Sequence, residues 1–403
     1  MANTSDLLGL IRSRLVRETS GRSLIPHLDG LRCIAIISVI VFHINGFVMR
    51  RAGLDYQQLQ VSHPLANLFA QGQVGVQLFF AISGFILSLP FATQYIQNGK
   101  TVRLRSYYLR RLVRLEPPYL IALTIVTILL IGWRGESWST VIPHYAASLV
   151  YCHYFVYGYA STIIPAAWSL EVEVQFYILA PLIARVLFRR RRWSRRLALM
   201  VTIFCFSALQ SNFNYPCDAP LHGWTLLHSV HWFLVGFLLA DLYVCGTLQA
   251  NQSVLWWDAA AAIGLALTGW FMQEQIAVHY LVPWTIMLFF VGVFKGHLFR
   301  RLLSLPIVYI VGGMCYTTYL YHGVCKGWLG DLILPSFQAL PFDLRVIAIS
   351  SILVPFIIVA STALFVVFER PFMSRELFQS IRGRLKGVVS VVNRTMRERS
   401  HRV

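Results

Sequence analysis

The sequence predicts an all-α, polytopic integral membrane protein, and three observations carry this prediction. The mean hydropathy is +0.60, with 57% hydrophobic and only 13% charged residues. Apolar runs of about 17–25 residues, the length that crosses a bilayer as a helix, recur along the whole chain. Lysine and arginine gather in alternate loops, as they do in the cytoplasmic loops of membrane proteins. A soluble globular core does not combine these properties.

Apolar runs place the predicted spans. Ten runs are long enough to cross the membrane, namely 31–49, 74–91, 117–133, 166–188, 197–213, 225–246, 254–272, 278–294, 303–322 and 345–368. A further apolar segment, 141–158, is rich in Tyr and His, and we interpret it as an interfacial or re-entrant piece. Counting this segment as a full span would place the basic run Arg189–Arg192 outside, against the positive-inside rule.

The charge distribution orients the predicted helices. If the amino terminus is inside, the cytoplasmic loops and tails hold 29 of the 35 Lys and Arg residues. The outer loops hold four, namely Arg50, Arg51, Arg134 and Lys326. Both termini are therefore expected in the cytoplasm, and this bias accounts for most of the net charge of +18 without a nucleic-acid partner.

Three parts result from these assignments. A basic cytoplasmic segment covers residues 1–27, a transmembrane domain covers 28–372, and a basic cytoplasmic tail covers 373–403. Basic tails of this kind are attracted to anionic membrane lipids. The seven cysteines form no CxxC pair, so no metal site is predicted.

Ionisable residues inside the predicted helices mark a candidate site, because such groups are costly in hydrocarbon and usually functional. Arg32 and His43 are eleven residues apart, which puts them on nearly the same helix face and roughly 16 Å apart in depth. Glu173 and His322, like His43, are predicted in the outer half of the bundle. Arg32 lies at the inner face with the arginines of 103–114. A basic inner mouth leading to an outer acid/base cluster suits a donor with a phosphorylated head and a long arm, such as a coenzyme A thioester.

Six motifs follow one another along the chain. They are LDGLR with the Arg32–x10–His43 spacing, Gly75–Leu87, YLRRLVRLEPPY, WSLEVEVQFYILAPLI, CYTTYLYH and FERPF. This set resembles acyltransferase family 3, the integral-membrane O-acyltransferases that modify bacterial glycans, glycolipids and some antibiotics. Gln77, Val174 and Cys315 depart from the family pattern.

The resemblance implies an enzyme of the bacterial inner membrane. It would move an acetyl or other short acyl group from cytoplasmic acyl-CoA to a hydroxyl of a carbohydrate-containing acceptor. That acceptor is a cell-surface polysaccharide, lipopolysaccharide, glycolipid or glycosylated metabolite. The expected partners are acyl-CoA, this acceptor and membrane lipids, with no permanently bound cofactor and no metal; a homo-oligomer stays open.

His43 and Glu173 are the predicted catalytic residues. His43 would act as general base, taking a proton from the acceptor hydroxyl as that oxygen attacks the thioester. Its alternative is a buried histidine bonded to a carbonyl oxygen. Glu173 would orient His43 or bind a sugar hydroxyl, because a buried carboxylate needs a partner. Pairing with a cation for packing is its alternative.

Donor binding is predicted at four arginines. The resemblance implies that Arg32 holds a coenzyme A phosphate, and marking the inner interface is its alternative role. On the third predicted span, 110 and 114, or 111 and 114, share one helix face. Arg110, Arg111 and Arg114 are therefore predicted phosphate ligands, with ordinary positive-inside charge as the alternative.

Acceptor binding is predicted at Trp168, Tyr319 and His322, with anchoring at the membrane interface as the alternative. Other residues are expected to be structural. Gly75, Ser83 and Gly84 would allow close helix approach, Glu369 would cap a helix, and Asp241, Asp258, His228 and His231 would have packing roles.

The absence of certain sequence motifs argues against some reaction mechanisms and functional classes. The sequence has no G-x-S-x-G elbow, which argues against a serine acyl-enzyme and favours direct transfer, although a transient acyl-histidine stays open. The alternative from another functional class is a glycolipid or polysaccharide-precursor transporter or flippase without acyl-transfer chemistry. Such a protein would more typically show paired repeats, and the sequence contains no internal repeat.

Overall fold

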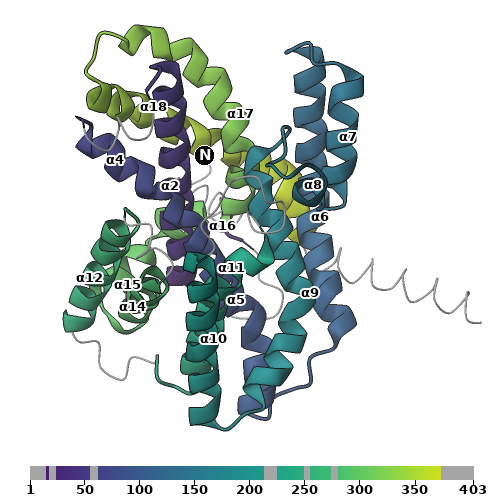
Figure 1. Ribbon diagram of the computed structural model, residues 1–403, viewed down its shortest axis with the longest axis vertical. Coiled ribbons are helices and arrows are strands. Elements are labelled where there is room, and N and C mark those ends of the chain that lie inside the picture. Colours follow the sequence, from purple (N-terminus) through teal and green to yellow (C-terminus); the bar gives the residue numbers. More distant parts are fainter. Residues whose placement is uncertain are drawn as a thin grey trace, which may run out of the picture.

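The computed structural model describes residues 15–17, 24–54, 62–212, 225–248, 255–273 and 280–373. Across these residues the chain forms helices without a strand, so the predicted all-helical class is confirmed there (Figure 1). The longer helices are α2 (Pro26–Arg51), α5 (Val74–Ile96), α6 (Leu104–Gly132), α9 (Trp168–Phe188), α10 (Arg192–Asn212), α11 (Leu226–Val244), α12 (Leu255–Phe271), α14 (Val282–Lys295), α17 (Cys315–Ile333) and α18 (Phe342–Leu364).

Shorter helices connect these long ones. They are α4 (Pro64–Ala70), η1 (Gln71–Gln73), α7 (Trp138–Leu149), α8 (His153–Tyr157), η2 (Pro165–Ala167), α15 (Leu298–Leu303), α16 (Pro306–Gly313), η3 (Leu334–Phe337), η4 (Phe365–Glu369) and η5 (Arg370–Met373). The predicted cytoplasmic parts 1–27 and 373–403 lie largely outside the described residues.

Five helical segments of the described chain are long and apolar enough to cross a membrane. They are Pro26–Arg51, Pro64–Ile96, Leu104–Gly132, Leu226–Val244 and Phe342–Met373. Each contains or nearly coincides with one of the predicted spans, because the apolar runs that predicted them also form the helices. The remaining predicted spans carry shorter or less apolar helices, so the count of ten and the orientation of the termini stay predictions.

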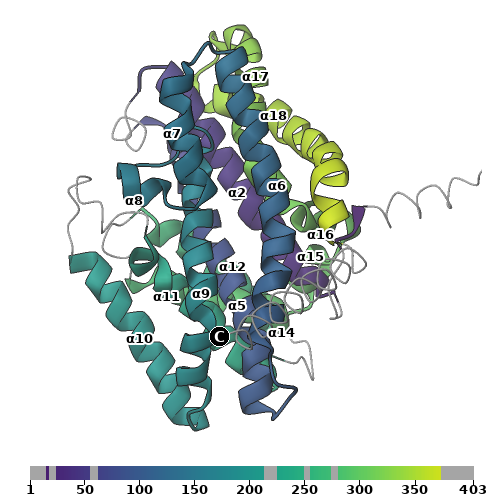
Figure 2. The same cartoon turned by 90° about the vertical axis from the view of Figure 1, so that its right-hand side faces the viewer.

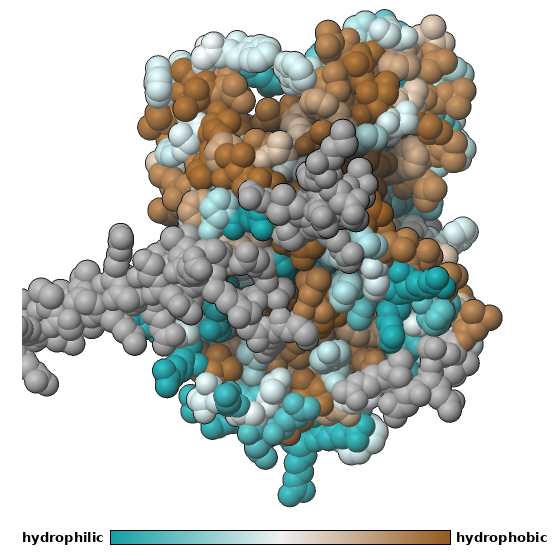
Figure 3. Space-filling view, turned by 180° about the vertical axis from the view of Figure 1, so that it is seen from behind, coloured by the Kyte–Doolittle hydropathy of each residue, from teal (hydrophilic) through white to brown (hydrophobic). Residues whose placement is uncertain are grey.

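Hydrophobic side chains form a broad surface band. Figure 3 shows brown, hydrophobic side chains over most of the upper part of one face, while hydrophilic ones gather at its lower end. In Figures 1 and 2, α7, α17 and α18 lie toward the upper end and α10 toward the lower end. The basic loop before α10 and the loop between α5 and α6 share this lower end, which we call the basic end.

The predicted span 303–322 differs from the structure. The chain leaves the helical conformation at Met314, and α16 and α17 are separate helices. Gly312 and Gly313 precede the break, and glycine is a poor helix former. Because α17 continues to Ile333, His322 lies in the middle of a helix and not at its outer end.

Segment 141–158 folds into two short helices, α7 and α8. The Ser137 hydroxyl caps α7 by accepting from the amide of Thr140 at 3.3 Å. The 12 residues of α7 measure about 18 Å, which is short of the roughly 30 Å hydrocarbon layer. The Glu171 carboxylate accepts from the amide of Tyr154 at 3.1 Å and so fastens the first turn of α8 to α9.

Close helix contacts in the core depend on glycine, as predicted. A Cβ atom on Gly84 would lie 2.1 Å from the carbonyl oxygen of Phe233, so α5 and α11 pack backbone against backbone. On the other face of α5, a Cβ on Gly75 would lie 2.3 Å from the carbonyl oxygen of Ala35 in α2. Helix α5 therefore lies between α2 and α11, and it brings residues of both faces to the centre of the molecule.

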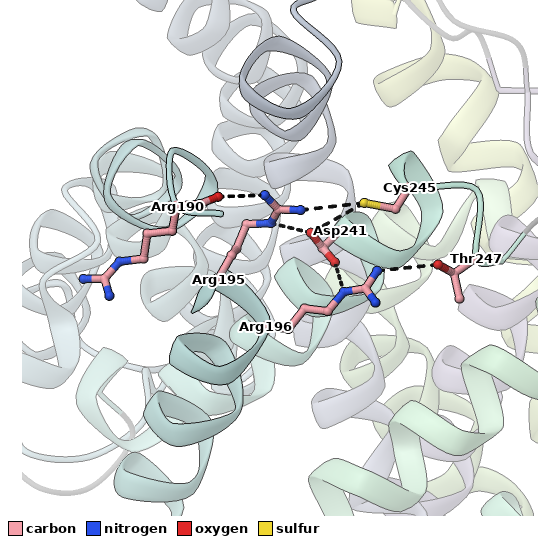
Figure 4. A network of polar contacts seen from close by, with 6 residues as sticks. All are labelled: Arg190, Arg195, Arg196, Asp241, Cys245 and Thr247. Carbon is pink, nitrogen blue, oxygen red and sulfur yellow. Dashed lines mark hydrogen bonds and ion pairs between the residues drawn. The ribbon is translucent and has the colours of Figure 1, made fainter. Parts of the chain in front are cut away.

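Buried carboxylates hold other helices together. Asp241, fully buried on α11, accepts from Nε of Arg195 at 2.5 Å and from Nε of Arg196 at 2.6 Å (Figure 4). This pairing fixes the start of α10 against the end of α11. Asp258 accepts from the amides of residues 297–299 at 3.0–3.1 Å and caps α15. The packing roles predicted for both aspartates are confirmed.

Glu369 anchors the start of α17. Its carboxylate accepts from the amide of Thr317 at 3.1 Å and from the Thr317 hydroxyl at 2.5 Å. The first turn of a helix has unsatisfied amides, and a carboxylate there is favourable. The predicted capping role of Glu369 is therefore confirmed, and the helix that it caps carries Tyr319 and His322.

Candidate active site

A cavity of about 830 Å³ lies between α2, α5, α6, α9 and α17. Its charged lining is strongly unbalanced among the described residues. Seven cationic side chains line it, namely Arg17, Arg32, Lys100, Arg103, Arg110, Arg111 and Arg114, whereas Asp29 and Glu173 are its carboxylates. A lining with this excess of positive charge favours a ligand that carries several negative charges.

Asp29 holds two of the cations that line the cavity. Its Oδ1 accepts from Arg32, one turn along the same helix, and from Nη1 of Arg17 at 3.2 Å. Asp29 itself is only 4% exposed, so its carboxylate binds the two guanidinium groups and not solvent. Arginine paired in this way keeps its remaining donors for a bound anion.

The arginines of α6 line the same cavity from the opposite side. Arg111 lies over the ring of Tyr107, with its Cζ 3.8 Å from the ring centre, and donates to the Tyr107 carbonyl at 3.1 Å. Arg114 is close enough to Asp29 and Glu369 to interact with both electrostatically. The structure therefore brings Arg32, Arg111 and Arg114 together at one cavity, as the donor-site prediction requires.

Glu173 lies in this cavity and not against His43. Its carboxylate accepts from the Ser83 hydroxyl and also interacts with Tyr177. Arg111 and Arg114 are close enough to Glu173 to interact with it electrostatically. The expected contact between Glu173 and His43 is not among the hydrogen bonds of the described residues, because helix packing turns Glu173 toward α5 and α6.

Tyr319 also lines the cavity. The Tyr319 hydroxyl donates to the carbonyl of Ala166 and lies 2.6 Å from Oγ of Ser169. These bonds join α17 to the start of α9. Trp168, the neighbouring residue, packs its ring edge-to-face on Phe80 at 6.3 Å. Trp168 is not among the residues that line the cavity.

Beyond Tyr319, His43 and His322 form a pair. Their ring centres are 4.9 Å apart, although the two residues come from α2 and α17. Nδ1 of His322 donates to the carbonyl oxygen of Tyr319 at 2.7 Å. In the neutral ring this bond leaves Nε2 of His322 as an acceptor. Tyr319 thus lines the cavity and also holds His322 of the histidine pair in place.

Comparison with known proteins identifies the family. The family model for the acyltransferase domain matches residues 25–370, which include every motif of the cavity and of the histidine pair. The chain belongs to acyltransferase family 3. Together with its long apolar helices, this membership makes it a helical, membrane-embedded acyltransferase-family protein.

Two relatives are O-acetyltransferase OatA from Staphylococcus aureus, strains NCTC 8325 / PS 47 and COL. Each is 26% identical to this chain over 341 residues, covering 77% of the chain and 51% of the relative. The chain therefore spans about half the length of the curated relatives that it matches. No solved structure matches the chain.

Family motifs account for part of this acyltransferase site and not for all of it. Arg32, Arg110, Arg111 and Arg114 were predicted and lie together. The motifs did not assign a role to Asp29, Ser83 or Tyr177, and Arg17 lies before the first motif. A signal existed for Asp29, since it stands three residues before Arg32 on one helix face.

Proposed function

We propose that the chain is an O-acyltransferase of the inner membrane. In this proposal the cavity binds acyl-CoA from the cytoplasm, and an acetyl or other short acyl group passes to a carbohydrate hydroxyl at the histidine pair. The observation that carries the proposal is the continuity of the site. Seven cationic side chains line the cavity, and Tyr319, which lines it as well, accepts through its carbonyl the hydrogen bond that holds His322 beside His43.

The positive charge of the cavity supports this donor. The phosphates of coenzyme A would bind Arg32, Arg111 and Arg114, since guanidinium groups bind phosphate oxygens bidentately. The pantetheine arm would extend past Ser83 and Glu173, whose polar groups suit its amides. Arg32 and His43 are roughly 16 Å apart by helix rise, which a long arm is needed to bridge.

The chemistry is a direct displacement in which one proton moves twice. His43 accepts the proton of the acceptor hydroxyl, and the oxygen attacks the thioester carbonyl carbon. The new C–O bond forms as the C–S bond breaks. The proton on His43 then passes to the departing thiolate, which leaves as coenzyme A. His322, held by its hydrogen bond to the Tyr319 carbonyl, would contact the His43 ring and fix its orientation.

Labelled acyl transfer tests this proposal. Purified protein in detergent is given acetyl-CoA with a labelled acetyl group and a glycan acceptor, and the labelled glycan is measured. His43→Ala is expected to bind acyl-CoA normally and to lose about 10²–10⁴ of its turnover, the usual contribution of a positioned base. His63→Ala, which lies outside the cavity lining, serves as the matched control.

Near-wild-type turnover in folded His43→Ala would contradict the single-base mechanism. Loss of donor binding in this variant would instead place His43 in the donor site. A wild-type protein that moves glycolipid across liposomes and never acylates it would favour the alternative flippase. Among the described residues, the broken helix at Met314 is an observation that points toward transport, because transporters use interrupted helices at their binding sites.

A further inference from the structure

A cationic cluster surrounds the C-terminal half of α17, at the end of the molecule opposite the basic end. Arg50 and Arg51 end α2, Arg134 follows α6, and Lys326 lies on α17 one turn beyond His322. These four residues come from three segments that are far apart in the sequence. We call them the outer cations.

Contacts on α17 show how closely the outer cations gather. Arg51 pairs with Asp331 of α17 at 2.5 Å. Nζ of Lys326 and Cζ of Arg51 both lie over the Phe47 ring, at 5.8 and 5.6 Å from its centre. Arg134 reaches α17 as well, because its Nη2 would lie 3.9 Å from a Cβ placed on Gly327.

Arg50 points back along α2 toward His43. Its Nη1 lies 3.6 Å from where a Cβ of Gly46 would stand, one turn before Arg50 and three residues after His43. Arg50 and Lys326 are both close enough to His43 to interact with it electrostatically, and Lys326 interacts with His322 in the same way. Two cations therefore flank the histidine pair.

Neither of these two cations has a carboxylate within ion-pairing distance in the part of the chain that the structure describes. Among the described residues, the ion pairs within 4 Å include Arg51 with Asp331 and none with Arg50 or Lys326. Lys326 is nevertheless partly buried, and a buried charge is costly without a partner. Asp331, which is paired with Arg51, interacts electrostatically with Lys326 from beyond 4 Å. The surroundings of the histidine pair therefore keep an excess of positive charge, which an anionic ligand would balance.

We infer that the acceptor is an anionic glycan whose carboxylate or phosphate group binds Lys326 and Arg50 while its hydroxyl faces His43. This inference rests on the proposed function and specifies its acceptor. In the proposed function the donor phosphates bind the arginines of the cavity, whereas Lys326 and Arg50 do not line that cavity and can serve the second substrate. The lysine ammonium is a compact point charge and the arginine guanidinium is a forked donor, so together they can bind either a carboxylate or a phosphate.

A matched acceptor pair tests the inference. Labelled acetyl transfer is measured to an oligogalacturonide, to the same oligomer with its carboxylates methyl-esterified, and to a phosphorylated mannose oligomer. Esterification removes the charge and keeps every hydroxyl. The wild type is expected to show a KM for the charged oligomers about 10-fold or more below that for the ester, and added salt should narrow this gap.

Variants assign the effect to residues. Lys326→Gln and Arg50→Gln are expected to raise KM about 10-fold for the charged acceptor and to leave KM for the ester and for acetyl-CoA unchanged. Arg51→Gln is the matched control, since Asp331 already neutralises Arg51. Comparing the KM for the oligogalacturonide with that for the phosphorylated mannose oligomer shows whether a carboxylate or a phosphate is preferred.

Three results would overturn the inference. Equal KM for the charged and esterified oligomers, with turnover intact, would show that the protein does not recognise its acceptor by charge. A fall in kcat for both acceptors alike in Lys326→Gln would make Lys326 a stabiliser of the transition-state oxyanion. Loss of activity that only anionic lipid restores would assign the cluster to the membrane surface. Absence of transfer to every acceptor would instead count against the proposed function itself.

Discussion

Arg111 offers the sharpest test of the donor site. Its guanidinium lies over the Tyr107 ring, with Cζ 3.8 Å from the ring centre, and Nη1 donates to the Tyr107 carbonyl at 3.1 Å. Arg111 is thus held in place before any ligand arrives, so little rotamer entropy remains to be lost on binding. Removing one charge-assisted contact to a phosphate costs about 1.5–3 kcal/mol, or roughly 10- to 150-fold in affinity.

We therefore expect Arg111→Ala to raise the Kd for acyl-CoA by that factor. Arg111→Lys should recover part of the loss, because the charge remains while the stacked, forked geometry is gone. Tyr107→Leu should weaken binding by a smaller factor, since it loosens Arg111 without removing it. Titration calorimetry on purified protein, with coenzyme A as ligand, measures all three.

Arg105→Ala is the matched control, because Arg105 stands on the same helix, is exposed and does not line the cavity. Its Kd should equal that of the wild type. Unchanged affinity in Arg111→Ala, or an equal loss in Arg105→Ala, would refute the reasoning. In either case the arginines of α6 would act as general positive charge and not as ligands.

Three further outcomes are expected. Gly84→Ala should lower the melting temperature by the equivalent of about 1–3 kcal/mol, because its Cβ meets the Phe233 carbonyl, whereas Gly269→Ala, with open space around it, should not. Glu369→Ala should destabilise by about 1–3 kcal/mol and reduce turnover, since the start of α17 loses its cap; stability equal to wild type would show the cap to be dispensable. A cysteine at position 194 should resist an impermeant thiol reagent in intact cells, and ready labelling would reverse the predicted orientation.

The position of each long helix was predictable because it depends on local sequence. An apolar run of sufficient length forms a helix that buries its own backbone polar groups, whatever its neighbours are. The described segments Pro26–Arg51, Leu104–Gly132 and Leu226–Val244 therefore overlap the predicted spans. The Arg32–His43 spacing likewise determined which groups share one face of one helix, since 3.6 residues make a turn.

Contacts between helices could not be predicted in the same way. Glu173 and His43 were predicted to lie together because both were expected at the same depth in the membrane. Depth does not determine which neighbouring helix a side chain faces. Packing of α5 against α2 and α11, through Gly75 and Gly84, turns Ser83 toward Glu173 and leaves His43 to face another helix.

The histidine pair was decided by the tertiary structure alone. Its second member was expected at a helix end, and it lies inside α17 because the helix begins anew after Met314 and runs on to Ile333. The bias of charge between loops predicted that Arg50, Arg51, Arg134 and Lys326 fall on one side of the membrane. Their gathering around one helix, beside that pair, depends on how α2, α6 and α17 pack, and helix packing is set by side-chain shapes that no single-helix pattern contains.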